Sequence, residues 1–253
     1  MLLSTILISA AEELAIGRAS DSLLPDESRL ELLFAGFGKE LDFFQDPDDA
    51  PITNISDIDS FEKNDDGEIE AIDFEECEIG GTLELRWLPL TLKKVDMTLN
   101  HFHGTYASHL LPPALTVVHL GRNKLVGSID LSTLPLGVRS LDLAQNCLSG
   151  TVDFSKIPLS LQQLTFFGNK LSGTVDLRAV KGTLGRSSGA ITCSLWSGEE
   201  VRKDCLFLSV QHNPFVGDIL VSDIAKVESL VVFSYTECES VVDGNGGVIK
   251  LKK

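Results

Sequence analysis

One run of acidic residues has the spacing of a calcium-binding loop. It extends from Glu62 to Asp73, and Asn64, Asp66 and Gly67 stand where such a loop has two oxygen ligands and its turn glycine. The first position, however, is Glu where Asp is usual, and the last is Asp where the ion needs a bidentate Glu. The end of the run also fits a strand, which cannot begin the second helix of an EF-hand. The sequence therefore favours a turn over a calcium site.

Four histidines within nineteen residues suggest zinc binding: His101, His103, His109 and His119. No cysteine and no second histidine pair at the spacing of a zinc site completes a tetrahedral set, so no metal or other cofactor is predicted. The chain also lacks a Gly-x-Ser-x-Gly elbow, a Walker loop and a dinucleotide fingerprint. Isolated carboxylates in strands do not make a glycosidase pair. The sequence thus predicts a protein that is not an enzyme.

The acidic charge is concentrated in the first third of the chain. The 253 residues carry a formal charge of -16, and residues 1–80 alone hold 22 acidic and 4 basic residues. The remaining 15 acidic and 17 basic residues leave the rest of the chain nearly neutral. This balance argues against nucleic-acid binding, which needs a basic surface to displace counterions from phosphates. It also indicates that the acidic first third and the nearly neutral remainder are two distinct regions of the chain.

The elements that would position these residues follow a period of 23 residues. The period is marked by Asn100, Asn123, Asn146 and Asn169, each with a proline eleven positions before and a glycine four positions after. The prolines are Pro89, Pro112, Pro135 and Pro158, and the glycines are Gly104, Gly127, Gly150 and Gly173. The phase extends back to Cys77 and forward, across 21 extra residues, to Asn213, with a degenerate copy near Thr236. The sequence predicts six clear repeats and one degenerate repeat.

Each repeat reads Leu-x-x-Leu-x-Leu-x-x-Asn-x-Leu-x-Gly-x-Val/Ile-Asp-Leu. The alternation of leucines predicts a strand with one buried face. The asparagine amide both donates and accepts hydrogen bonds, so stacked copies can satisfy the backbone groups that a turn exposes. Glycine suits a tight turn with positive φ. Since one unit cannot bury its apolar face alone, the repeats must stack into a curved solenoid.

This repeat resembles the leucine-rich repeat family. The Leu-Ser-Gly-Thr-Val-Asp form at 148–153 is similar to the plant-type subclass and to repeat proteins of kinetoplastid protists. The resemblance implies an α/β repeat fold: a right-handed solenoid with a concave parallel β-sheet, short second strands after each glycine and a helical N-terminal cap. It also implies a binding scaffold without catalytic activity, because most members of the family are of that kind.

Three segments are expected. Residues 1–60 form an acidic, helical N-terminal cap, in which the apolar spacing between Arg29 and Phe44 predicts a helix. The paired cysteines of the extracellular plant cap are missing. Residues 61–240 form the solenoid, and residues 241–253 form a C-terminal cap with a closing strand from Val248 to Leu251. The caps cover the apolar faces of the terminal repeats.

An insert of 21 residues lies between about residues 182 and 202. Its Gly and Ser content favours a mobile loop over an ordered functional loop. Trp196 is its sharpest feature, since an exposed tryptophan can anchor a partner. The alternative is that Trp196 packs back onto the solenoid.

The candidate binding residues flank the buried strand positions and project from the concave sheet. They are Asp73, Glu75, Asp96, His119, Asp142, Phe167, Phe207 and Gln211. This face is acidic in its first repeats and aromatic in its last repeats. We expect a protein-interaction scaffold whose acidic end steers a basic protein partner and whose aromatic end supplies contact area. The alternative is that the insert or the C-terminal cap covers Phe167 and Phe207.

The cysteines bear on the compartment. The chain has an odd, sparse set that does not resemble a secreted disulfide framework, which favours the cytoplasm. The apolar start, residues 1–11, has no basic residue before it, so an N-terminal helix is favoured over a cleaved signal peptide. The alternative is a secreted or cell-surface receptor-like ectodomain, for which Asn54 offers a glycosylation sequon. No stretch is long enough to span a membrane.

Overall fold

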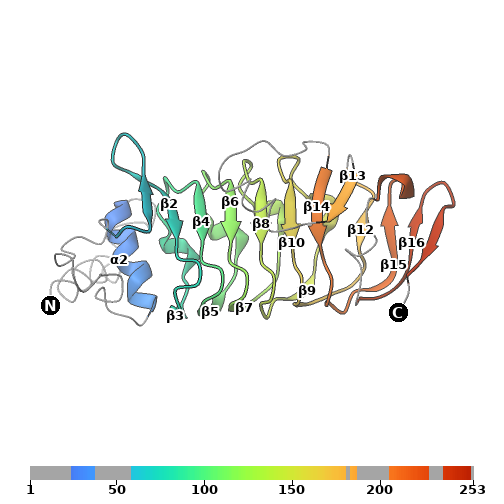
Figure 1. The fold of residues 1–253 in the computed structure, drawn as a ribbon, viewed down its shortest axis with the longest axis horizontal. Coiled ribbons are helices and arrows are strands. Elements are labelled where there is room, and N and C mark those ends of the chain that lie inside the picture. The colour runs from blue at the N-terminus through green and yellow to red at the C-terminus, as the bar shows by residue number, and fades with distance from the viewer. Residues whose placement is uncertain (1–23, 38–57, 181–182, 187–204, 228–235, 252–253) are drawn as a thin grey trace.

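The computed structural model describes residues 24–37, 58–180, 183–186, 205–227 and 236–251. Its strands lie side by side along one elongated axis (Figure 1). The helix α2 (Asp26–Phe37) lies at one end, and the hairpin of β16 (Glu237–Asp243) and β17 (Val248–Lys250) lies at the other. The described chain is a parallel-sheet β-solenoid, which confirms the fold class predicted from the 23-residue period.

An eight-stranded sheet forms one side of the solenoid, here called the front sheet. In spatial order its strands are β1 (Phe61–Lys63), β2 (Ile69–Asp73), β4 (Lys94–Asp96), β6 (Val117–His119), β8 (Ser140–Asp142), β10 (Gln163–Thr165), β14 (Cys205–Ser209) and β13 (Thr183–Arg186). All neighbouring pairs are parallel except β1 and β2, which form an antiparallel hairpin. From β2 to β10 the paired residues are 23 apart, as in Asp73 with Asp96 and His119 with Asp142.

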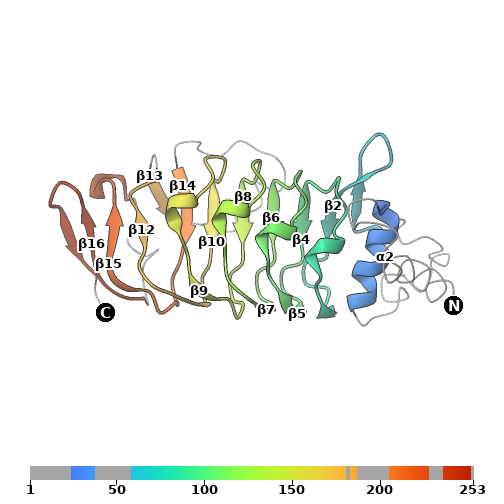
Figure 2. The ribbon, with the colours of Figure 1, turned by 180° about the vertical axis from the view of Figure 1, so that it is seen from behind.

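The remaining strands follow each repeat asparagine and form smaller sheets. One contains β3 (Gly80–Thr82), β5 (His101–Thr105) and β7 (Lys124–Val126); a second contains β9 (Ser149–Thr151) and β11 (Lys170–Ser172); a third contains β12 (Asp176–Leu177), β15 (Val216–Val221), β16 and β17. Short second strands were expected, but after each glycine; instead they begin just after the asparagine and lie before or across the glycine, as β7 ends before Gly127 and β9 contains Gly150. Single 3-10 turns then lead back toward the front sheet (Figure 2). They are η4 (Leu85–Trp87), η5 (Ser108–Leu110), η6 (Leu131–Thr133), η7 (Phe154–Lys156) and η8 (Ile224–Lys226).

The repeat asparagines tie each turn to the one before it. The side-chain oxygen of Asn123 accepts the Phe102 N–H at 3.0 Å, and its amide nitrogen donates to the Met97 carbonyl at 2.8 Å. Asn146 does the same one turn later with Leu125 and Leu120. The residue before each repeat position has φ between 51° and 68°: Glu76, Leu99, Arg122, Gln145, Gly168 and His212. This left-handed residue turns the chain so that the asparagine points inward.

Helix α2 covers the apolar end of the first repeat. The Asp26 carboxylate accepts the Leu90 N–H at 2.9 Å and the Thr91 hydroxyl at 2.7 Å, and the Arg29 guanidinium donates to the Arg86 carbonyl at 2.8 Å. Close backbone packing requires Gly36, because a Cβ there would lie 2.3 Å from the carbonyl oxygen of Thr82. The sequence predicted a helix over residues 29–44, whereas α2 begins three residues earlier, at Asp26. The part of the predicted range beyond Phe37 lies outside the described residues.

The insert contributes a strand to the front sheet. Strand β13 pairs with β14 on one side, and Leu184 forms a bridge to Val227 on the other. Thus four residues of the expected loop are ordered, whereas Trp196 lies outside the described residues. At the far end, β17 pairs antiparallel with β16, where the sequence predicts a closing strand. The segment limits 1–60, 61–240 and 241–253 stay predictions.

Candidate functional site

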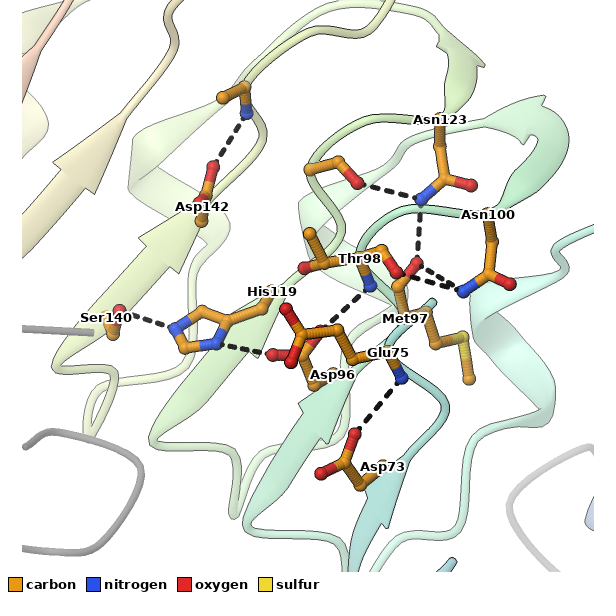
Figure 3. A network of polar contacts seen from close by, with 12 residues as sticks. Asp73, Glu75, Asp96, Met97, Thr98, Asn100, His119, Asn123, Ser140 and Asp142 are labelled. Carbon is orange, nitrogen blue, oxygen red and sulfur yellow. Dashed lines mark hydrogen bonds and ion pairs between the residues drawn. The ribbon is translucent and has the colours of Figure 1, made fainter. Parts of the chain in front are cut away.

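The outer face of the front sheet brings together five of the eight candidate residues. Cross-strand pairing aligns Asp73, Asp96, His119 and Asp142 in one row from β2 to β8. Figure 3 shows this row with Glu75 beside it, just beyond the end of β2. The parallel strands place the row residues on successive turns, about 4.8 Å apart. The sequence therefore predicted the alignment correctly through the 23-residue period.

His119 connects two strands of this row. Its Nδ1 lies 3.0 Å from Asp96 Oδ2, and its Nε2 lies 2.9 Å from Ser140 Oγ (Figure 3). This Asp–His–Ser order is the connectivity of a catalytic triad. The side chains of His119 and Ser140 are, however, 1% and 0% exposed, so a substrate cannot reach the hydroxyl. We therefore assign the three residues to the structure of the sheet.

The aspartates of the row also have a local structural role. Asp73, Asp96 and Asp142 each accept the backbone N–H two residues later, at 3.1, 2.8 and 2.8 Å. These short Asx turns end the front strands and lead the chain toward the left-handed residue. The presence of aspartate at this repeat position therefore has a structural reason, the turn, that does not require a binding partner.

Crowding of carboxylates changes their protonation. Partial burial raises the pKa of Glu75, and the neighbouring Asp96 and Asp73 raise it further. Burial also raises the pKa of Asp142, which the Ala144 N–H only partly offsets. Burial acts in the same direction on Asp96, but the hydrogen bond and charge of His119 lower the pKa of Asp96 overall. The ionised form is therefore stabilised at Asp96 and disfavoured at Glu75 and Asp142.

The candidate residues differ in how far a partner could reach them. Asp73 and Glu75 are exposed, Asp96, Asp142 and Phe167 are partly buried, and His119, Phe207 and Gln211 are buried. Exposure thus decreases from the first strands of the front sheet toward β14. Ser140, which the sequence pattern placed in the outward register but which was not a candidate, belongs to the buried part.

The two aromatic candidates lie in different surroundings. Phe207 is 8% exposed, and a Cβ on Gly185 of β13 would lie 3.0 Å from its ring. Because β13 pairs beside β14 with Gly185 opposite Phe207, the ring packs against the insert strand within the sheet, and Phe207 does not supply an open contact surface. The alternative, in which the insert or the C-terminal cap covers Phe167 and Phe207, stays a prediction. Phe167 instead packs edge-on against the ring of His212, with the ring centres 5.0 Å apart.

The two metal hypotheses have a structural explanation. The side-chain oxygen of Asn64 accepts the N–H groups of Asp66 and Glu68 at 3.0 and 2.9 Å, so it closes the β1–β2 turn. His101 and His103 lie on β5, His109 on η5 and His119 on β6, on different sides of the solenoid. Within the described ranges, no group of three His, Cys, Asp or Glu side chains is arranged to hold a metal ion.

Two further features concern the compartment. Cys77, Cys147, Cys205 and Cys238 carry free thiols in the structure. No helix in the described part of the chain is long and apolar enough to cross a membrane.

Comparison with known proteins identifies the fold. No model of a protein family matches the chain, and a search of curated proteins finds no match. Among solved structures, the leucine-rich repeat ectodomain of the receptor kinase GASSHO1/SCHENGEN3 from Arabidopsis thaliana, solved with CASPARIAN STRIP INTEGRITY FACTOR 2, is 17% identical with a TM-score of 0.50. That match covers 76% of this chain and 23% of the ectodomain chain.

Two other plant structures give similar matches. Pollen Receptor Kinase 3 is 18% identical with a TM-score of 0.48, covering 72% of this chain and 79% of its own. The BIR3–SERK2 complex from Arabidopsis thaliana is 24% identical with a TM-score of 0.46, covering 58% of this chain and 82% of its own. The GASSHO1/SCHENGEN3 match, together with the sheets of the repeat, shows that the chain has the leucine-rich repeat fold. The similarity to kinetoplastid repeat proteins stays a prediction.

Proposed function

We propose that this leucine-rich repeat solenoid is a non-catalytic scaffold that binds a protein partner on the outer face of its front sheet. The binding surface is the acidic end of that face, formed by β1, β2 and β4. The partner is basic. The buried Ser140 and His119 support a role without catalysis, since neither can contact a substrate.

The observation that carries this proposal is the exposed carboxylate cluster beyond β2. Glu75 is exposed, and so are Asp73 and the following Glu76 and Glu78. The pKa of this otherwise exposed Glu75 is raised by loss of water on one side of its carboxyl and by repulsion from Asp96, Asp73 and Glu76. A basic partner would relieve that repulsion, and opposite charges across an interface accelerate association.

The solved neighbours support a recognition role in a general way. The GASSHO1/SCHENGEN3 ectodomain has the same fold and was solved with a second protein factor. That structure is the ectodomain of a plant membrane receptor kinase, which supports the alternative that this chain acts outside the cell or at its surface. Intact-mass analysis of the native protein tests that alternative. A cleaved N-terminus or a glycan at Asn54 would support it, and an unmodified full-length chain would contradict it.

Association kinetics at two salt concentrations test the proposed face. A partner is first isolated by affinity capture with the full chain and then measured against Asp73→Asn/Glu75→Gln, which removes two charges and keeps both side-chain shapes. The amide oxygen introduced at position 73 can still accept the backbone N–H of position 75. We expect association to slow about tenfold at low salt and little at high salt, because screening removes the same attraction.

The matched control is Glu237→Gln/Glu239→Gln, which removes two exposed charges at the other end of the solenoid. It should leave the association rate unchanged. Equal slowing in both double variants would mean that net charge, and not the acidic end, attracts the partner. An unchanged rate in Asp73→Asn/Glu75→Gln would contradict the proposed face.

A further inference from the structure

The turn between β16 and β17 contains the chain's only Asn-Gly pair, Asn245 followed by Gly246. Glycines stand on both sides of the asparagine, at positions 244, 246 and 247, and residues 244–246 are exposed. A Cβ placed on Gly244 or on Gly246 would meet no atom within 4 Å, so the space around the asparagine is open. Such a pair can react by itself, because the backbone nitrogen that follows an asparagine is a nucleophile next to the side-chain amide carbon.

The fold does not hold the side-chain amide of Asn245. Within the described residues only the backbone N–H of Asn245 is hydrogen-bonded, to Asp243 Oδ1 at 2.9 Å. The N–H of Gly246 donates to the Asp243 carbonyl at 3.3 Å, beyond the usual range for a backbone hydrogen bond. Little in this turn therefore keeps the Gly246 nitrogen from reaching the amide carbon of Asn245.

The other asparagines in the described part of the chain are held in place. The repeat asparagines, such as Asn123, are buried; the side-chain oxygen accepts a backbone N–H, and the amide nitrogen donates to carbonyl groups. Asn64 lies in the β1–β2 turn, where its side-chain oxygen accepts two N–H groups and its nitrogen donates to Glu68 at 2.9 Å. None of them is followed by glycine. Asn245 therefore differs from them in both sequence and hydrogen bonding.

We propose that Asn245 is a site of spontaneous deamidation. The Gly246 nitrogen attacks Cγ of Asn245 and closes a succinimide ring; the bond from Cγ to the side-chain nitrogen breaks, and ammonia leaves with the proton of the Gly246 N–H. Water, the only co-reactant, then opens the ring at one of its two carbonyl carbons. Opening at Cγ gives aspartate. Opening at the main-chain carbonyl gives isoaspartate, in which the backbone continues through the former side chain.

Isoaspartate at position 245 would loosen the C-terminal hairpin, because Asp243 organises this turn. Its Oδ1 accepts the N–H groups of Asn245 and Gly247 at 2.9 and 2.8 Å, and its Oδ2 accepts the Ile224 N–H of η8 at 3.2 Å. The extra methylene in the main chain displaces Gly247 relative to Asp243, and the new carboxylate repels that of Asp243. The pairing of β17 and its link to η8 therefore both weaken.

Timed incubation of the full chain at neutral pH, followed by peptide mapping with mass analysis, tests the proposed site. We expect a mass gain of about 1 Da, the difference between an amide and a carboxylic acid, in the peptide that contains Asn245. That peptide should separate into two products, aspartate and isoaspartate. The peptides that contain the repeat asparagines and Asn64 should stay unmodified over the same time.

Two glycine variants form a matched pair for this experiment. Gly246→Ala should slow the mass gain at least about tenfold, because a Cβ hinders the attacking nitrogen. Gly244→Ala should react at the wild-type rate, since its nitrogen does not take part. Gly246 has φ of 84°, so alanine strains the turn and thermal unfolding verifies that this variant is folded. Asn245→Ser, which lacks the amide and leaves the glycines in place, should abolish the mass gain.

Hydrogen exchange measures the effect on the hairpin. In the purified isoaspartate form, the backbone N–H groups of β17 should exchange about tenfold faster than in the unmodified chain, whereas those of β6 should not change. Asn245→Asp adds the charge without the extra main-chain atom, so it should show a smaller increase. Partner association at the acidic end, at the other end of the solenoid, should be the same in all forms, so this proposal and the proposed function can fail separately.

Three outcomes would overturn the inference. The first is an unmodified Asn245 in the folded chain over a time in which the urea-unfolded chain deamidates there, which would show that the fold protects the pair. The second is a mass gain that persists in Asn245→Ser. The third is equal exchange of β17 in the isoaspartate and unmodified forms, which would contradict the loosening of the hairpin.

Discussion

The two edges of the front sheet carry residues of equal periodicity and opposite burial. At the edge where strands end, the repeat asparagines are buried and bridge successive turns, as Asn123 and Asn146 do. At the edge where strands begin, Leu136 and Leu159 are almost fully exposed. Both sets recur every 23 residues. A period therefore identifies a position in the stack, whereas burial and hydrogen bonding identify which positions the fold requires.

The largest effect is expected at the asparagine edge. Asn146→Ala removes the acceptor for the Leu125 N–H and the donor to the Leu120 carbonyl. The Leu125 N–H loses its partner, and the Leu120 carbonyl keeps only the longer hydrogen bond from Asn123 at 3.2 Å, so the free energy of unfolding should fall by about 3 kcal/mol. Urea denaturation measures this fall. Gln145→Ala, at the exposed neighbour, is the control and should change little; a fall below about 1 kcal/mol for Asn146→Ala would remove the distinction between the edges.

Two glycines extend the comparison to the backbone. Gly127 follows the asparagine edge with φ of 111°, and a Cβ there would lie 2.9 Å from the Tyr106 carbonyl oxygen. Gly127→Ala should therefore lower the free energy of unfolding by about 2 kcal/mol. Gly137 lies at the leucine edge, where a Cβ would meet Thr116 at an ordinary 3.8 Å. Gly137→Ala should stabilise the fold by up to about 0.5 kcal/mol in the same urea experiment. Similar losses at both glycines would contradict the contrast.

Between the edges, Asp142 should make stability depend on pH. Burial raises its folded-state pKa, so the stability contributed by its protonated form is fully present below the unfolded pKa and is lost as pH rises through the folded pKa. Asp142→Asn keeps the acceptor for the Ala144 N–H without the charge. It should raise the free energy of unfolding at neutral pH and raise it less in acid.

Asp153→Asn is the control for this pH dependence. The hydroxyl and the backbone N–H of Ser155 both donate hydrogen bonds to the Asp153 carboxylate and lower its pKa. The change of stability with pH therefore has the opposite sign to that of Asp142. The stability that the ionised Asp153 contributes is present above its unfolded-state pKa and is lost as pH falls through its folded-state pKa. Asp153→Asn should therefore lose stability at neutral pH. A gain in both variants would show that general charge repulsion, and not the burial of Asp142, causes the effect.

The smallest effect is expected at the leucine edge. Leu136→Ser/Leu159→Ser should change the free energy of unfolding by less than about 0.5 kcal/mol, because the folded chain buries little of either side chain. Thermal and urea unfolding both measure this. A loss of several kcal/mol would mean that Leu136 and Leu159 pack within the chain, and the contrast between the edges would fail.

The sequence predicted much of the fold because one physical requirement repeats. Each turn must satisfy the same backbone groups, so Asn100 and its equivalents recur in phase with the buried leucines. The exposure of the candidate face could not be predicted in the same way. His119 and Asp96 share a register but differ in burial, which depends on neighbouring side chains and strands and not on repeat phase.

The insert and the exposed Leu136 show two other limits of prediction from sequence. The Gly and Ser content of residues 182–202 indicated a mobile loop, yet Thr183–Arg186 found a place in the sheet because its backbone groups could pair with β14. Leu136 lies outside the apolar positions that define the core pattern, so its exposure became visible only in the fold. Proline before an in-phase leucine was the signal that could have marked it.

Strand β13 makes the two sides of the solenoid unequal in length. On the front it lies between β14 and Val227, whereas on the opposite side β15 pairs directly with β16. One additional strand spacing of about 4.8 Å across a thickness of about 10 Å corresponds to a bend of about 25°. We therefore expect the last turn to be angled away from the front, so that a rigid partner lying flat on the first repeats would lose contact with the surface after β14.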